Sequence, residues 1–260
     1  MPIRAYTTSI KDVHTFLQDG CSGVAYYFEQ KVMTLSSKGF RLIEYRAGSA
    51  RVLTPAEPLT HTFIVDRTGD NDFFIFSNRQ DLQKLGWLWS VAARCRGSLI
   101  YLPTRKNPLS PYLKRHWFEK GLDLVLLHHH LQFPLKDWKR IRSRLQRGKP
   151  HSIDAASMKS DIARSLNLTR RDFDRLWHKY PHDRLHAEKR FETLFLVGSS
   201  RVFRYMIGSF IDLARTGPRF SEPGRYHDHV HLDSFLKTDL GAPDYISLTV
   251  DYDDQKLWGE

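Results

Sequence analysis

The first third of the chain mixes β-rich stretches with amphipathic helical ones. Apolar residues at helical spacing in "TTSIKDVHTFLQDG" predict a helix that Gly20 would end. The stretches "GVAYYFEQKVMTL" and "GFRLIEYRA" predict strands, with the turn "SSKG" between them. "HTFIVDRTGDNDFFIFSN" predicts a hairpin, because its central Gly and Asn can adopt positive φ. Turn formation accounts for Asp66, Asp70 and Asp72 there without a bound cation.

The following pattern predicts a helix over "RQDLQKLGWLWSVAARC", a short buried strand in "GSLIYLP" and a core strand in "LDLVLLHHHLQF". "PLKDWKRIRSRLQRGK" predicts a helix with Pro134 near its first turn. A mainly helical middle follows, and β patterns return in "HDHVHLDSF" and "YISLTVDY". The chain is therefore expected to be α+β. The predicted parts are a mixed α/β domain over 1–133, a basic helical region over 134–215, and a C-terminal β-hairpin with an acidic tail over 216–260, which would pack on the first domain if the chain is one domain.

The net charge of the chain limits the classes of function that fit it. The 260 residues include 40 Lys and Arg against 29 Asp and Glu, a formal net charge of +11. A surplus of this size attracts polyanions, of which nucleic acid is the commonest in a cytoplasm. Cys21 and Cys95 lie far apart and lack zinc-finger spacing. No signal-peptide pattern or membrane-spanning apolar run is visible, so we expect a cytoplasmic protein with no membrane partner.

The clearest local pattern is "SDIARSLNLTRRDFDRLWHKY", which predicts two short helices joined by a tight turn. Ser160 would cap the first helix, Asn167 would take a left-handed turn, and Thr169 would cap the second helix. The apolar residues predicted to face inward are Ile162, Ala163, Leu166, Leu168, Phe173 and Leu176.

This pair resembles the helix-turn-helix DNA-binding superfamily over about twenty residues. Ala163 stands where the family needs a small residue for close helix packing, and Asn167 stands where it most often has Gly. The resemblance implies that the second helix enters the major groove, where Arg suits guanine and a capping Thr suits phosphate. A structural helical hairpin would give the same spacing. The residues implied to contact DNA are Thr169, Arg170, Arg171, Arg175 and His178.

The predicted helix upstream is rich in cations and would add phosphate contacts, unless it is simply a solvated face. Its candidate contact residues are Lys136, Lys139, Arg140, Arg144 and Arg147.

Histidines form two clusters. His227, His229, His231 and Asp233 alternate in "RYHDHVHLDSF", so a strand would place them on one face, where neighbouring pairs such as His229 and His231 could hold a divalent metal ion. "HVH" resembles the metal-binding strand of the HUH endonucleases.

In that family a tyrosine nucleophile follows on a helix, with a lysine three residues later. Here Tyr252 lies in a predicted strand and Lys256 comes four residues after it. A polar edge strand is the favoured explanation of the histidines. In the other cluster, His128, His129 and His130 would alternate faces, so at most two could converge, and a structural role is favoured over general-base catalysis.

These observations predict a nucleic-acid-binding protein without catalysis or a cofactor, DNA being favoured over RNA, acting as a regulator or as a subunit of a nucleoprotein complex. One alternative is a metal-dependent nuclease or strand-transferase that uses a divalent ion on His229 and His231. Another is a charged protein-interaction module, with a protein partner or a homo-oligomer.

Overall fold

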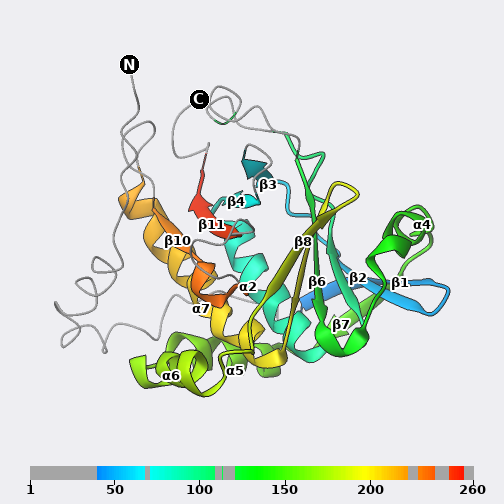
Figure 1. The fold of residues 1–260 in the computed structure, drawn as a ribbon. Coiled ribbons are helices and arrows are strands. Elements are labelled where there is room, and N and C mark those ends of the chain that lie inside the picture. Colours follow the sequence, from blue (N-terminus) through cyan, green and yellow to red (C-terminus); the bar gives the residue numbers. More distant parts are fainter. Residues whose placement is uncertain are drawn as a thin grey trace. The chain divides into compact units, whose positions relative to one another are not determined.

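The computed structural model describes residues 40–67, 71–108, 113, 121–221, 228–237 and 246–254. These residues belong to one compact unit, Ser37–Glu260. They form two mixed β-sheets and five α-helices, which confirms the α+β class (Figure 1). The predicted helix in "TTSIKDVHTFLQDG", the predicted strand before "SSKG", Asp70 and His227 lie outside the described residues.

The larger sheet has seven strands in the order β7-β1-β2-β5-β6-β9-β8. Pairing is antiparallel except between β2 and β5 and between β6 and β9, which are parallel. The strands are β1 (Phe40–Ala47), β2 (Ala50–Pro55), β5 (Leu99–Leu102), β6 (Asp123–His128), β7 (Lys149–Ile153), β8 (His186–Arg190) and β9 (Thr193–Gly198).

The smaller sheet joins the predicted hairpin to the C-terminal strands. β3 (Thr62–Arg67) and β4 (Asp72–Ser77) are antiparallel, as expected. β11 (Ser247–Tyr252) pairs in parallel with β4 and antiparallel with β10 (His229–His231). The C-terminal strands therefore complete a sheet that begins near residue 62.

Two long helices pack side by side (Figure 1). α2 (Arg79–Arg94) buries Leu82, Leu85, Leu88, Trp89 and Ala92, as its apolar spacing predicts. α7 (Ser200–Phe220) packs along α2 and also contacts α5 (Ala155–Leu166), β10 and β11. The remaining helices are the short α4 (Trp138–Arg142) and α6 (Arg170–Asp174). No helix in the described residues is long and apolar enough to cross a membrane.

Residues 134–215 are mostly helical, but they also include β7, β8 and β9, which the sequence pattern did not predict. Every residue of β9 but Val197 is buried. The turn between β8 and β9 consists of Phe191 and Glu192, both with positive φ. Asn and Gly usually occupy such turns, so the sequence carried no ordinary turn signal for this hairpin.

The predicted basic helix was too long. A 3₁₀ turn (Leu135–Asp137) leads into α4, which ends at Arg142. Arg144 and Arg147 follow the helix, and Arg147 has positive φ. Arg142 donates to the buried carboxylate of Asp123 (3.0 Å), so it serves the core rather than a surface.

Candidate anion-binding pocket

Three strands of the larger sheet bring a set of polar residues to one edge. β6 and β9 are parallel, and their last residues, His128 and Gly198, lie opposite each other. β5 runs antiparallel to β6 and so starts at the same edge, just after Arg96. The N-cap of α7, Ser199, directly follows β9. The carboxyl ends of parallel strands are a common place for ligand sites in α/β sheets.

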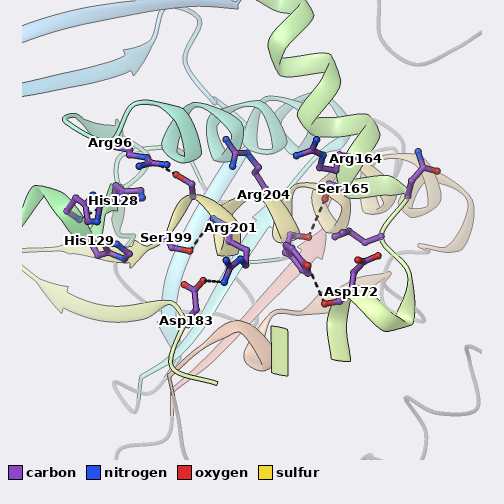
Figure 2. Close-up of a pocket in the computed structure, with 15 residues that line it drawn as sticks. Arg96, His128, His129, Arg164, Ser165, Asp172, Asp183, Ser199, Arg201 and Arg204 are labelled. Carbon is purple, nitrogen blue, oxygen red and sulfur yellow. Dashed lines mark hydrogen bonds and ion pairs between the residues drawn. The ribbon is translucent and has the colours of Figure 1, made fainter. Parts of the chain in front are cut away.

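A cavity of about 720 Å³ lies at this edge, within the size range of small-ligand sites. In Figure 2, His128 lies toward one end of the cavity and Arg164 toward the other, with Arg201 between them. Its wall contains four guanidinium groups and two carboxylates. The arginine and aspartate residues that line the cavity are Arg96, Arg164, Arg201, Arg204, Asp172 and Asp183.

The arginines are positioned by different elements. Arg96 precedes β5 and donates to the hydroxyl of Ser200 (3.2 Å). Arg204, one turn into α7, donates to buried Asp161 of α5 (3.2 Å). Asp161 also accepts from Ser90 and Arg94 of α2 (2.7 and 2.6 Å). This carboxylate therefore ties three helices together and fixes one wall of the cavity.

Both acids in the wall already have cationic or capping partners. Asp183 accepts from Arg201 (3.1 Å), whose guanidinium also lies 3.7 Å from the ring centroid of Tyr180. Asp172 accepts from the hydroxyl and the backbone N–H of Thr169 (2.6 and 2.9 Å), and these bonds lower the pKa of Asp172. Among the described residues, neither Arg96 nor Arg164 forms a salt bridge with a carboxylate, so the cavity keeps an excess of positive charge.

The start of α7 adds to this charge. Ser199 caps the helix by accepting from the N–H groups of Arg201 and Val202 (3.1 and 3.2 Å). The aligned peptide dipoles of a long helix place partial positive charge at its N-terminus, which favours an anion.

The three consecutive histidines converge, so the expectation that at most two could do so was wrong. β6 ends at His128, and a 3₁₀ turn (His129–Leu131) follows at once. The turn ends the alternation of side chains, and possible ligand atoms of all three rings lie within 4.8 Å of one another. His129 and His130 are exposed, whereas His128 is 3% exposed.

His128 is held as a neutral donor. Its Nδ1 accepts the backbone N–H of His130 (3.2 Å), which leaves the proton of the neutral ring on Nε2. Burial lowers the pKa of His128 to about 4, and the neighbouring charges of His129, Arg96 and His130 act in the same direction. Among the described residues, the Nε2–H group has no hydrogen-bond partner.

This histidine cluster is the one group in the described residues with three possible ligands for a metal ion, and it does not fit a cation well. With Nδ1 accepting and Nε2 protonated, His128 offers no lone pair for coordination. The surrounding guanidinium groups would also repel a divalent ion. A neutral N–H donor among arginines suits an anion.

The predicted helix pair is present, with local differences. Thr169 caps α6 as expected, Leu176 is buried, and Phe173 is half-buried. The predicted left-handed turn at Asn167 was wrong, since its φ is −100°. Ala163 is exposed, so the helices do not pack over it.

Capping also differs from the prediction at the first helix. Ser160 lies inside α5, and Asp154 caps that helix by accepting from the N–H of Ser157 (2.7 Å).

The predicted DNA-contacting residues lie outside the pocket. Exposed side chains on or beside α6 are Thr169, Arg170, Arg171, Arg175 and His178, and exposed side chains around α4 are Lys136, Lys139, Arg140, Arg144 and Arg147. The pocket instead takes Arg164, Asn167, Leu168 and Asp172 from the α5–α6 pair.

The predicted histidine strand is short. β10 ends at His231, and Asp233 begins a 3₁₀ turn, so the alternation does not reach that residue. The exposed rings of His229 and His231 lie 4.8 Å apart between centroids.

Tyr252, the nucleophile that the HUH resemblance implies, lies on β11 and is 1% exposed. Its hydroxyl donates to Asp254 (3.0 Å), and burial raises its pKa, opposite to what a nucleophile needs.

Sequence reasoning missed the four arginines of the pocket because they come from three separate segments. A usable signal was present in "TLFLVGSSR", a β-rich run followed by serines that can cap a helix. Comparison of the chain with protein families, curated proteins and solved structures gave no match. The function must therefore be argued from the geometry.

Proposed function

We propose that the protein binds nucleic acid without catalysing its cleavage, and that the pocket at the start of α7 holds phosphate groups. One observation carries this proposal: four guanidinium groups, an imidazole N–H and a helix N-terminus line a single cavity whose two carboxylates already accept hydrogen bonds. Arginine forms charge-assisted hydrogen bonds with phosphate, often through two N–H groups at once.

The charge of the whole chain favours a polymer over a small free anion. The net charge is +11, and exposed cations lie outside the pocket on α6 and around α4. A polyanion can contact several of these at once, and each phosphate contact releases counterions. A small anion would use the pocket alone and leave the other cations without a role.

DNA is the favoured polymer on the basis of the α5–α6 pair. Arg170, Arg171 and Arg175 are exposed on or beside α6, which suits contact with a nucleic acid that also reaches the pocket. A role as regulator or as subunit of a nucleoprotein complex would follow from such binding.

The test is affinity for duplex DNA, single-stranded DNA and RNA over a series of salt concentrations, with and without Mg²⁺, and with a check for cleavage. We expect affinity to fall steeply with salt and no strand to be cut. Replacing Arg96 and Arg164 together by Ala should reduce the slope of log K against log salt by roughly 1.4 to 1.8, the value for two phosphate contacts.

A matched control removes the same charge elsewhere. Arg41 and Arg46 are exposed on β1 outside the pocket. The R41A/R46A variant should leave the slope nearly unchanged if the pocket is the binding site. Equal slopes for both double variants would show that only net charge matters, and absence of binding at low salt would exclude the proposal.

A further inference from the structure

A second, smaller cavity of different chemistry adjoins the pocket. This cavity has a volume of about 310 Å³ and shares Ser165, Leu168 and Tyr205 with the basic pocket. The part away from the arginines combines apolar or aromatic side chains with the polar Ser209, Thr216 and His229. The apolar and aromatic residues there are Leu166, Phe173, Leu213 and Val230.

Two carboxylates line the smaller cavity, and none of the described residues that line it is a lysine or an arginine. Asp212 pairs with Arg215 (3.0 Å), and Asp228 accepts from the hydroxyl of Thr216 (2.5 Å). Carboxylates repel phosphate but accept hydrogen bonds from the amino groups of bases. The two connected cavities therefore favour a ligand that is anionic at one end and flat, with N–H donors, at the other.

The size of the pocket limits what enters it. A cavity of about 720 Å³ accommodates one or two nucleotide units at most, by comparison with small-ligand sites. The phosphates of an intact duplex lie on a convex surface with both neighbours attached, so they reach less deeply into a concave pocket than the end of a strand does. The end of a strand can enter, because its last nucleotide has a neighbour on one side only.

The donors in the basic pocket also suit a terminal phosphate. A phosphate monoester carries close to two negative charges and three free oxygens, whereas a phosphodiester carries one charge and two free oxygens. Arg96, Arg201 and the Nε2–H group of His128 stand at the sheet edge beside Ser199. His128 lines the pocket, and its N–H is available to donate to a bound anion there.

Building on the proposed function, we infer that the site receives the end of a nucleic-acid strand. A terminal phosphate monoester lies against Arg96, His128 and Arg201, and the adjoining base enters the smaller cavity beside Leu168 and Phe173. Aromatic side chains that can stack on a base stand at this entrance, with the rings of Phe173 and Tyr205 5.7 Å apart between centroids.

The test compares short single-stranded oligonucleotides of one sequence, labelled internally, that carry a 5′-phosphate, a 3′-phosphate or hydroxyls at both ends. A circular strand provides a ligand without ends. One phosphorylated end should bind about tenfold or more tightly than the hydroxyl form, because hydrogen bonds between charged groups are strong. Removing the terminal base from the preferred oligonucleotide should reduce its affinity.

Substitutions distinguish recognition of the strand end at this site from attraction by the net charge of the protein. Arg96 is exposed, and its one hydrogen bond in the described residues is to Ser200, so R96A should fold. It should lose the preference for the phosphorylated end while keeping weaker, salt-dependent binding. R46A removes the same charge outside the pocket and should keep the preference. A second variant, H128Q, should also lose most of the preference.

Each contrary outcome excludes a different claim. Equal affinity for all ends and for the circle would overturn end recognition while leaving nucleic-acid binding intact. Equal affinity for a free nucleoside monophosphate and the phosphorylated oligonucleotide would identify a small-molecule site instead. A lack of salt-dependent binding to every strand would overturn the proposed function itself.

Discussion

His128 is the residue in which burial, charge and hydrogen bonding combine most closely. It is the last residue of a strand that is buried along its whole length, and its ring is fixed by the N–H of His130. Protonating this ring would place a cation beside Arg96 in a desolvated position. The protein therefore keeps a neutral donor in a positively charged pocket.

The lowered pKa of His128 has a consequence for stability. The ring of His128 is protonated near pH 6.5 in the unfolded chain and near pH 4 in the folded chain. Its contribution to the free energy of unfolding is therefore complete above pH 6.5 and is lost as the pH falls toward 4. We expect the unfolding free energy of the wild type to fall relative to that of H128Q over this range, by up to about 1.4 kcal/mol per pH unit.

Urea denaturation at pH 7, 6 and 5 measures this difference. The comparison with H128Q is needed because the contribution of Asp251 to stability changes with pH in the opposite direction. Burial raises its pKa to about 7, so its contribution to stability falls as pH rises from 3.8 toward 7. If the two proteins keep a constant difference from pH 7 to pH 5, the ring of His128 is not held neutral by the fold.

At the scale of elements, strands and helices with strong apolar periodicity were predictable. The spacing of Leu82, Leu85 and Leu88 marked α2 correctly, and the hairpin β3–β4 carried Asn71 with positive φ in its turn. The hairpin β8–β9 was missed because its turn uses Phe191 and Glu192, which do not ordinarily favour that conformation. Local sequence preference could not reveal a turn that tertiary pairing imposes.

The pocket was harder to predict than the elements that form it. Arg96, Arg164 and Arg201 belong to separate segments of the sequence. The end of the sheet at which the pocket forms exists only because β6 and β9 pair in parallel, which brings the last residues of these two strands together. A single sequence contains no direct signal for that pairing. The histidine triplet was visible, but strand alternation was extended past the end of β6 at His128, into the 3₁₀ turn that contains His129 and His130.

The α6 helix supports a prediction of its own. It is only five residues long, and Arg170 and Arg171 at its start are exposed. If they contact base edges, R170A and R171A should each weaken binding to a selected preferred duplex by about 1 to 3 kcal/mol more than binding to random duplex. The measurement is a pair of titrations for each variant at one salt concentration.

The same titrations on R140A/R144A provide the comparison for that helix. Both of these arginines are exposed around α4, where uniform weakening on all sequences and a flatter salt slope are expected. If R170A and R171A also weaken all sequences equally, they contact phosphates and the helix does not read bases.

At the scale of the whole molecule, the C-terminal strand holds distant parts of the chain together. β11 lies between β10 and β4, and the ring of Tyr252 packs against Gly217 of α7. A Cβ atom at Gly217 would come within 2.2 Å of that ring, so α7 approaches β11 as closely as a glycine allows. The buried ring of Tyr252 thus joins the smaller sheet to the helix that begins at the pocket.

This arrangement predicts losses of stability of very different size for two substitutions of Tyr252. Y252A should lower the unfolding free energy by about 3 to 5 kcal/mol, because it removes a buried aromatic ring from a close-packed contact. Y252F keeps the ring and loses only the hydrogen bond to Asp254, which should lower it by about 1 kcal/mol. Urea denaturation monitored by tryptophan fluorescence distinguishes the two. Y252F should also bind nucleic acid like the wild type, because a tyrosine that is this deeply buried supports the fold and does not carry out strand transfer. If the wild type cleaves a strand and Y252F does not, that conclusion is reversed.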